Sequence, residues 1–339
     1  MTTEGNATLS QFGDGSPDPT EETVEEARHV TQGDEVAELV DLSEHRFPDA
    51  DGSVELAVTQ VDYTVEGVGD EEYPVLHVFG RTADKEAEHV RVFDFQPYFY
   101  TPVESLDHEA PDDRALRESD FVDDRLMEER IVGVQTRGDR EPSLDDPEAD
   151  EVVTYESIRG AELVRVFGQT PRDVGQLRNR FDHFEADILF PNRLLIDKDI
   201  TSGVHVPAQR ADDGTLKVHH EQLTAVDLDV EPRVHTFDIE VDDRAGFPED
   251  GEETIICMTS HDSYRDEYVA WLYDAPDAAV EAPETLEGFE FWNPEGDATV
   301  EIRVFDTEEA MHEDYVDYLT ATDPDVLTGW NFDDFDAPY

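Results

Sequence analysis

The chain of 339 residues has little cysteine and no long apolar run. Its single cysteine, Cys257, excludes an intrachain disulfide and is typical of a reducing compartment. Cys257 lies in the apolar stretch TIICMTS, so we expect a buried structural thiol rather than a nucleophile. No apolar run approaches the roughly 18 residues of a membrane helix, and the N-terminus lacks the basic and apolar regions of a secretion signal. We therefore expect a cytoplasmic protein with no membrane partner.

Positive charge is also scarce. There are 87 acidic and 24 basic residues, the net charge is -63, and only three of the basic residues are lysines (Lys85, Lys198 and Lys217). Hydrophobic residues make up 37% and aromatic residues 9%, which is enough for packed cores and argues against general disorder. In molar salt the Debye length falls to about 3 Å, so surface carboxylates repel one another little. The composition therefore predicts a folded protein adapted to a high-salt cytoplasm.

The composition of the chain changes at about residue 54, which separates a tail from a first folded part. Residues 1–53 are acidic and rich in Gly, Pro and Thr, which predicts a disordered tail. Residues 54–230 form the second part, and an acidic, proline-bearing loop or insertion is expected at 104–150. Strands are predicted for VELAVTQVDYTV, YPVLHVFGRT, HVRVFDFQPYFYTP and ELVRVFGQ, and a helix for TPRDVGQLRNRF.

A second folded region is expected at 231–339. Four strands are predicted in RVHTFDIEV, ETIICMTSHD, YVAWLYD and VEIRVFD. They are followed by a helix in TEEAMHEDYVDYLTAT, for which Asp306 and Glu309 suggest a capping box, and then by a strand at DVL and a turn. This order of elements predicts a mixed α/β sheet for this region. The fold class expected for the whole chain is α/β and α+β.

Two carboxylates, Asp238 and Glu240, interrupt the apolar stretch VHTFDIEV. Other Asp-x-Glu pairs in this acidic chain lie among proline, glycine and charged residues, whereas this pair has apolar or β-branched neighbours on both sides. Residues two apart in a strand share a face at about 6.5–7 Å, so Phe237, Ile239 and Val241 are expected to face the core instead. If buried, the pair would repel and favour a hard divalent cation. The alternative is an exposed edge face of an acidic protein.

A second polar cluster follows the last predicted strand. The string TGWNFDDFDAPY carries Asn331, Phe335 and Asp336, and its other two aspartates, Asp333 and Asp334, are expected to be solvated turn residues. A carboxylate that follows another core strand can converge on the first pair. Two divalent ions about 3.5–4 Å apart can activate a water and stabilise the leaving oxygen in phosphodiester cleavage.

Together, FDIE and GWNFDDFDAPY resemble the first two exonuclease motifs of family B DNA polymerases. Upstream, VDYTVEG, FQPYFY, TPRDVGQL and ADILFPNRLLIDKDI occur in the order of the N-terminal domain of archaeal members, so the resemblance covers about 55–339. It implies an N-terminal template-binding domain at 54–230 and an RNase H-like 3′-5′ exonuclease domain at 231–339. It also implies that Asp238, Glu240 and Asp336 are catalytic and bind Mg²⁺ or Mn²⁺, and that Asn331 and Phe335 position the frayed 3′ strand.

The resemblance stops before the family's third exonuclease motif, palm, fingers and thumb. We therefore expect the N-terminal part of a haloarchaeal DNA-directed DNA polymerase with a partial proofreading exonuclease, inactive as it stands. One alternative is a non-catalytic module that binds DNA or template uracil, or a subunit of a split polymerase. Another is a free-standing DEDD-type exonuclease, against which the upstream region argues.

Three further sites are expected, the first from the same resemblance and the other two from charge and spacing in the sequence. A pocket for template uracil would involve Tyr63, Pro97, Pro171, Val174, Ile188, Phe190 and Arg193, although these residues could equally be ordinary core. Residues 155–198 hold seven basic and seven acidic residues, so this locally neutral stretch is the expected DNA-facing surface, with Arg172, Arg178 and Arg180 as contacts. In the tail, Asn6, Leu9 and Phe12 of NATLSQFG have the spacing of a peptide that binds a sliding clamp, or are a chance grouping.

Overall fold

The structure is a computed structural model that describes residues 47–111, 113–137, 149–244, 253–276, 283 and 298–338. All of these lie in one compact unit, Phe47–Tyr339. The expected clamp-binding peptide lies outside the described residues. None of the described helices is both long and apolar enough to cross a membrane.

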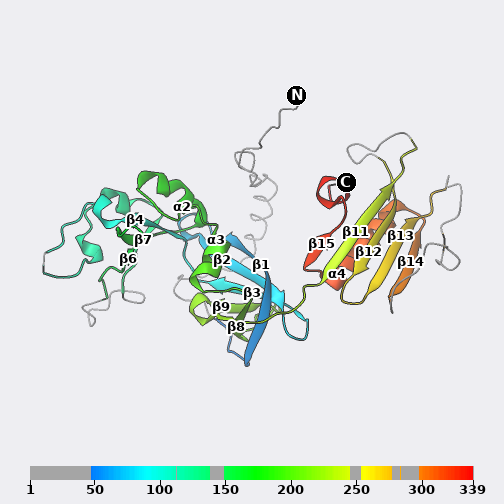
Figure 1. Cartoon of the computed structure of the whole chain (residues 1–339), viewed down its shortest axis with the longest axis horizontal. Helices are drawn as coiled ribbons and strands as arrows, with labels where there is room; N and C mark the ends of the chain where they lie inside the picture. Colours follow the sequence, from blue (N-terminus) through cyan, green and yellow to red (C-terminus); the bar gives the residue numbers. More distant parts are fainter. Residues whose placement is uncertain are drawn as a thin grey trace, which may run out of the picture. The chain divides into compact units, whose positions relative to one another are not determined.

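The first sheet has six strands in the order β10-β8-β1-β2-β3-β9. Figure 1 labels all of these strands except β10. Its strands are β1 (Ser53–Glu66), β2 (Tyr73–Arg81), β3 (Ala87–Phe93), β8 (Gly203–Pro207), β9 (Leu216–His219) and β10 (Thr224–Val226). Alternate residues such as Val78, Val90 and Val204 are fully buried on one face, where Leu194 of helix α3 (Phe190–Asp197) packs with them. Pro191 near the start of α3 fits the first turn, where a missing N–H costs nothing.

A smaller sheet is formed by β4 (Tyr98–Pro102), β7 (Glu162–Gly168) and β5 (Ile131–Val134), with β6 (Thr154–Glu156) paired to β7. Its core holds Phe99, Val164 and Val166, all fully buried. Helix α2 (Pro171–Leu177) follows β7. The Thr170 and Asp173 side chains cap its first turn reciprocally, and this explains why the helix begins there.

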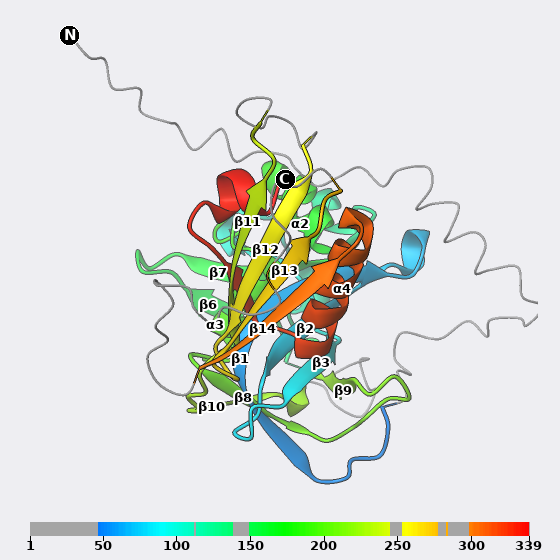
Figure 2. The same ribbon diagram turned by 90° about the vertical axis from the view of Figure 1, so that its right-hand side faces the viewer.

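The third sheet has the order β14-β13-β12-β11-β15 and carries the predicted carboxylates. Its strands are β11 (Val234–Val241), β12 (Ile255–Asp262), β13 (Glu267–Tyr273), β14 (Thr299–Phe305) and β15 (Val326–Thr328). Helix α4 (Glu308–Thr322) lies along one face beside β13 and β14 (Figure 2). Met311, Tyr315 and Tyr318 of α4 are buried against Trp271 and Phe237.

The predicted mixed α/β architecture is confirmed, with three local corrections. The N-cap of α4 is Thr307, whose hydroxyl accepts from the Ala310 amide, so the expected capping box at Asp306 and Glu309 is wrong. The predicted loop at 104–150 contains strand β5 and short 3₁₀ turns. The turn after β15 is one turn of π-helix at Phe332–Asp336, a form often found at functional sites.

Candidate functional site

Strand β11 alternates as its sequence predicts. Phe237 and Ile239 are buried in the core, whereas Asp238 and Glu240 lie on the opposite, exposed face. The two carboxylates are therefore not buried as a pair, and the exposed-face alternative describes their surroundings better. Neighbouring β15 pairs with β11 only at Val234–Thr236, so the segment with the carboxylates has an open edge on that side.

The parallel pairing of β15 with β11 returns the chain to this open edge. Gly329 follows β15 directly, and a Cβ atom there would lie 2.3 Å from the carbonyl oxygen of Phe237 and 3.4 Å from Oδ2 of Asp336. No side chain fits at the first of these distances. Glycine at this position therefore lets the segment after β15 cross β11 closely, and it places Asp336 beside the strand that carries Asp238.

Asp336 itself is held by the π-helical turn. The amides of Phe335 and Asp336 both donate to the carbonyl of Asn331, at 2.9 and 3.3 Å, and Phe335 packs against the core. Asp336 is only 6% exposed, and its Oδ2 atom has no hydrogen-bond partner among the described residues. A buried carboxylate oxygen without a donor is costly, and a cation bound at this position would offset that cost.

The electrostatics of the site point the same way. Partial burial raises the pKa of Asp238, and the charge of Asp336 raises it further. Burial also raises the pKa of the Cys257 thiol to about 11, with help from Glu240, which lies opposite it in the strand register, and from Asp238. Cys257 is therefore protonated at neutral pH, as expected for a structural thiol. Burial is the main cause of both shifts, and the neighbouring carboxylates add to each of them.

The donor set suits a hard divalent cation only in part. Asp238 and Asp336 interact, and both offer oxygen ligands of the kind that Mg²⁺ and Mn²⁺ take. In the part of the chain that the structure describes, however, no three His, Cys, Asp or Glu side chains are gathered closely enough to hold a metal ion. The side chains of Asp333 and Asp334 lie outside the described atoms. Two of the three expected ligands are thus brought together, and Glu240 is two residues along the same strand face.

The expected uracil-pocket residues are divided between two cores. Phe190 packs in the six-stranded sheet, where its ring meets Tyr63 edge-on at 5.5 Å, whereas Val174 belongs to the core of the smaller sheet. Pro171 begins helix α2, and Pro97 is buried directly before β4. Arg193 is 4% exposed, and its guanidinium lies between Glu185 and the Tyr98 ring. Ile188 is half-buried.

The side chains of the expected DNA contacts differ in their exposure to solvent. Arg172 and Arg180 are exposed, and Arg180 pairs with Glu128. Arg178 is half-buried and donates to the carbonyl of Ala186 at 3.0 Å. In the second exonuclease-like motif, Asn331 is exposed and Phe335 is half-buried. Arg172, Arg180 and Asn331 therefore have the most solvent-facing side chains of this set.

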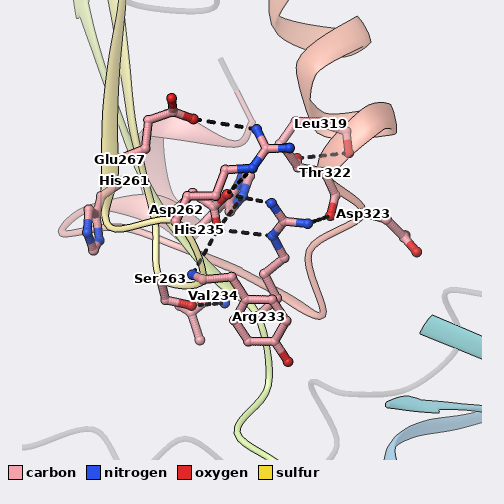
Figure 3. Close-up of polar contacts among 12 residues, drawn as sticks. Arg233, Val234, His235, His261, Asp262, Ser263, Glu267, Leu319, Thr322 and Asp323 are labelled. Carbon is pink, nitrogen blue, oxygen red and sulfur yellow. Dashed lines mark hydrogen bonds and ion pairs between the residues drawn. The ribbon is translucent and has the colours of Figure 1, made fainter. Parts of the chain in front are cut away.

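One polar cluster beside the site was missed by the sequence reasoning. Arg233, directly before β11, donates through Nε and Nη2 to the fully buried carboxylate of Asp262 at 3.0 and 2.5 Å, and through Nη1 to the carbonyl of Thr322 (Figure 3). Burial would raise the pKa of Asp262, but the hydrogen bonds from Arg233 and the Tyr264 amide lower it overall. The sequence signal was weak, because a polar residue at a strand end is ordinary.

A comparison with known families matches the part of the chain that holds this site. Residues 181–339 match the family described as DNA polymerase family B, exonuclease domain. This segment is therefore similar to the exonuclease domain of family B DNA polymerases. It contains both carboxylate clusters and the β11–β15 pairing that joins them.

Named relatives extend the similarity over most of the chain. The DNA polymerase delta catalytic subunit of Mesocricetus auratus is 27% identical over 308 residues, which is 78% of this chain and 26% of that protein. The corresponding subunit of Dictyostelium discoideum is 22% identical over 88% of this chain and 29% of that protein. The DNA-directed DNA polymerase of Escherichia phage RB69 is 32% identical over 117 residues, or 32% of this chain and 13% of its own.

A solved structure supports the fold. The family B DNA polymerase of the hyperthermophilic archaeon Pyrobaculum calidifontis has a TM-score of 0.55 and 21% identity, over 84% of this chain and 31% of that one. The chain thus spans less than a third of the length of the proteins that it matches. The fold is therefore one of mixed sheets, and the segment that matches the exonuclease domain has an RNase H-like fold. Likeness over less than a third of their length does not carry the activity of the whole polymerases to this chain.

Proposed function

We propose that this chain supplies the N-terminal, template-contacting region of a DNA-directed DNA polymerase together with the first two motifs of its 3′-5′ proofreading exonuclease. The observation that carries the proposal is the pairing of Asp238 with Asp336. These residues are 98 positions apart, and the β11–β15 pairing and the close approach at Gly329 bring them together. They meet inside the segment that matches the family's exonuclease domain.

Asp238, Glu240 and Asp336 would hold Mg²⁺ or Mn²⁺ at the open edge of β11. A bound pair of such ions supplies an activated water and stabilises the leaving oxygen of a phosphodiester. The protein's own contribution is to keep two carboxylates close in spite of their repulsion, with the Asp336 oxygen held ready in a buried turn. Exposed Asn331 and half-buried Phe335 on the same turn would position the 3′ end of a single strand.

Binding of the DNA template is the role that we propose for residues 54–230. Its support is that the Tyr63 and Phe190 rings pack edge-on at the six-stranded sheet. In addition, Tyr98 of the smaller sheet donates to the carboxylate of Asp197 at the end of α3. The second candidate function is that of a non-catalytic module that binds uracil in the DNA template. This candidate rests on the same residues. Haloarchaeal origin, a high-salt cytoplasm and a clamp-binding tail remain predictions from the sequence.

Terbium luminescence tests the carboxylate site, because Tb³⁺ binds carboxylate oxygens and emits when a nearby tryptophan is excited. Trp330 is 98% exposed and lies between Gly329 and Asn331, so it is a built-in sensitiser. In molar KCl, which screens the many other carboxylates, Asp238→Asn and Asp336→Asn should each weaken Tb³⁺ binding at least tenfold. Mn²⁺ should compete with Tb³⁺ for the site.

Two control variants make the result specific. Trp330→Phe should lower the sensitised emission, and Trp271 in the core of the same sheet remains as a donor. Asp212→Asn, at an exposed aspartate in the turn between β8 and β9, should leave the affinity unchanged. Equal Tb³⁺ affinity in the wild type and in Asp238→Asn would contradict the proposed site.

A further inference from the structure

Arg81, the last residue of β2 in the six-stranded sheet, makes its strongest contacts with the exonuclease sheet. Its Nε donates to both carboxylate oxygens of Asp325 at 3.0 and 2.9 Å, and its Nη2 donates to the carbonyl of Asp323. The Arg81 and Asp325 side chains are only 5% and 8% exposed. Asp323 is the left-handed C-cap of α4, and Asp325 directly precedes β15. Arg81 therefore holds the turn through which the chain enters β15.

Asp325 also joins the two strands of the site. Its Oδ2 accepts from the Arg233 amide at 2.7 Å, and the amides of Asp325 and Val326 donate to the Arg233 carbonyl at 2.9 and 3.1 Å. Arg233 directly precedes β11, which carries Asp238. The Asp325 carboxylate, which Arg81 contacts, thus links the first residues of β11 and β15, where the two strands begin side by side.

The surroundings keep this contact out of water. The Arg81 and Arg233 guanidinium groups lie 5.7 and 5.5 Å from the centre of the Tyr264 ring, and the Lys85 ammonium lies 4.4 Å from it. Salt screens buried pairs much less than exposed ones. Removal of one partner from a buried pair leaves the other charge uncompensated, so the geometry of this turn depends strongly on Arg81.

We propose that Arg81 is a positioning residue for the exonuclease carboxylates, acting from the six-stranded sheet. It holds the Asp323–Asp325 turn and, through β15 and Gly329, the register that brings Asp336 to Asp238. The site is then fully formed only when the six-stranded sheet is attached to it. This inference rests on the function proposed above for that site.

Terbium affinity of the 339-residue chain tests the inference, with four variants of it. Arg81→Met keeps the bulk of the side chain but removes its hydrogen bonds, and it should weaken Tb³⁺ binding about tenfold, the lower end of the effect of groups that orient metal ligands. Arg81→Lys should give an intermediate affinity, since an ammonium supplies charge without the planar fork. The control Arg91→Met, on neighbouring β3, removes a more exposed ion pair with Glu66 of β1.

The fourth variant separates positioning from general destabilisation. Val78→Ala removes fully buried bulk from the same strand as Arg81 without touching Asp325. At a temperature where every variant is folded by circular dichroism, Arg91→Met and Val78→Ala should bind Tb³⁺ within twofold of wild type. Wild-type affinity in Arg81→Met, or an equal loss in Val78→Ala, would overturn the inference and leave the site itself standing. A wild-type signal insensitive to Asp238→Asn would overturn the proposed function and the inference together.

Discussion

Replacing Asp336 by Asn should stabilise the protein at neutral pH in the absence of divalent ions. The Asp336 carboxylate is 6% exposed, its Oδ2 has no partner among the described residues, and its charge raises the pKa of Asp238. Asparagine keeps the shape of the side chain, and although its amide would also lack a partner, it removes the buried charge and its repulsion with Asp238. We expect a gain of about 1 kcal/mol, or roughly 2–4 °C in Tm by the scaling for units of about 150–250 residues.

The pH dependence of this effect follows from the raised pKa of Asp238. A carboxyl group whose pKa is raised on folding destabilises the folded state when the pH is above that pKa. This destabilisation is lost as the pH falls through the raised pKa, because the group becomes protonated. The wild type should therefore gain stability relative to Asp336→Asn as the pH is lowered from 7 through the raised pKa. The Asp238→Asn and Asp336→Asn gains should be less than additive in the double variant, because each removes the same repulsion.

Divalent ions should make the wild type more stable than Asp336→Asn, which is the reverse of the order expected without metal. At 100 times its Kd, a ligand that binds only the folded state adds about 2.7 kcal/mol. Mn²⁺ should thus raise the Tm of the wild type and leave Asp336→Asn nearly unchanged, with Asp212→Asn as the matched control. A lower Tm for Asp336→Asn than for wild type at pH 7 without metal would refute the reasoning, because the carboxylate would then have a stabilising partner.

Three other predictions concern the wider chain. In a polypeptide that also supplies the third exonuclease motif, Asp238→Ala should abolish Mn²⁺-dependent degradation of single-stranded DNA, and persisting turnover would show that the site is misassigned. A peptide of residues 1–20 should bind a sliding clamp, and Phe12→Ala should remove that binding; equal affinities would leave the tail without this role. Fluorescence anisotropy in high KCl should show tighter binding of uracil- than of thymine-containing single strands, weakened by Phe190→Ala but not by the control Phe332→Ala; equal affinities for the two oligonucleotides would eliminate the pocket.

Much of the exonuclease sheet could be predicted because local patterns determine it. The alternation of Phe237, Asp238, Ile239 and Glu240 allows only one arrangement of faces in a strand, and the structure has that arrangement. The spacing of Met311, Tyr315 and Tyr318 places them on one face of α4, and this face is buried. The exact start of α4 at Thr307 depends on which side chain reaches the Ala310 amide. A sequence pattern does not decide between neighbouring capping residues, because helix ends are defined only to within one or two residues.

What the sequence could not decide is which distant residues meet. The approach of Asp336 to Asp238 depends on parallel pairing of β15 with β11 and on the absence of a side chain at Gly329. The contact of Arg81 with Asp325 joins residues 244 positions apart, and neither has a local signature, because each looks like an ordinary charged residue at the end of an element. Periodicity records only which face of its own element a residue occupies. The partner on that face is fixed by how the sheets pack, and so the carboxylates were predictable one by one, whereas their convergence and the arginine that holds it were decided by the tertiary structure alone.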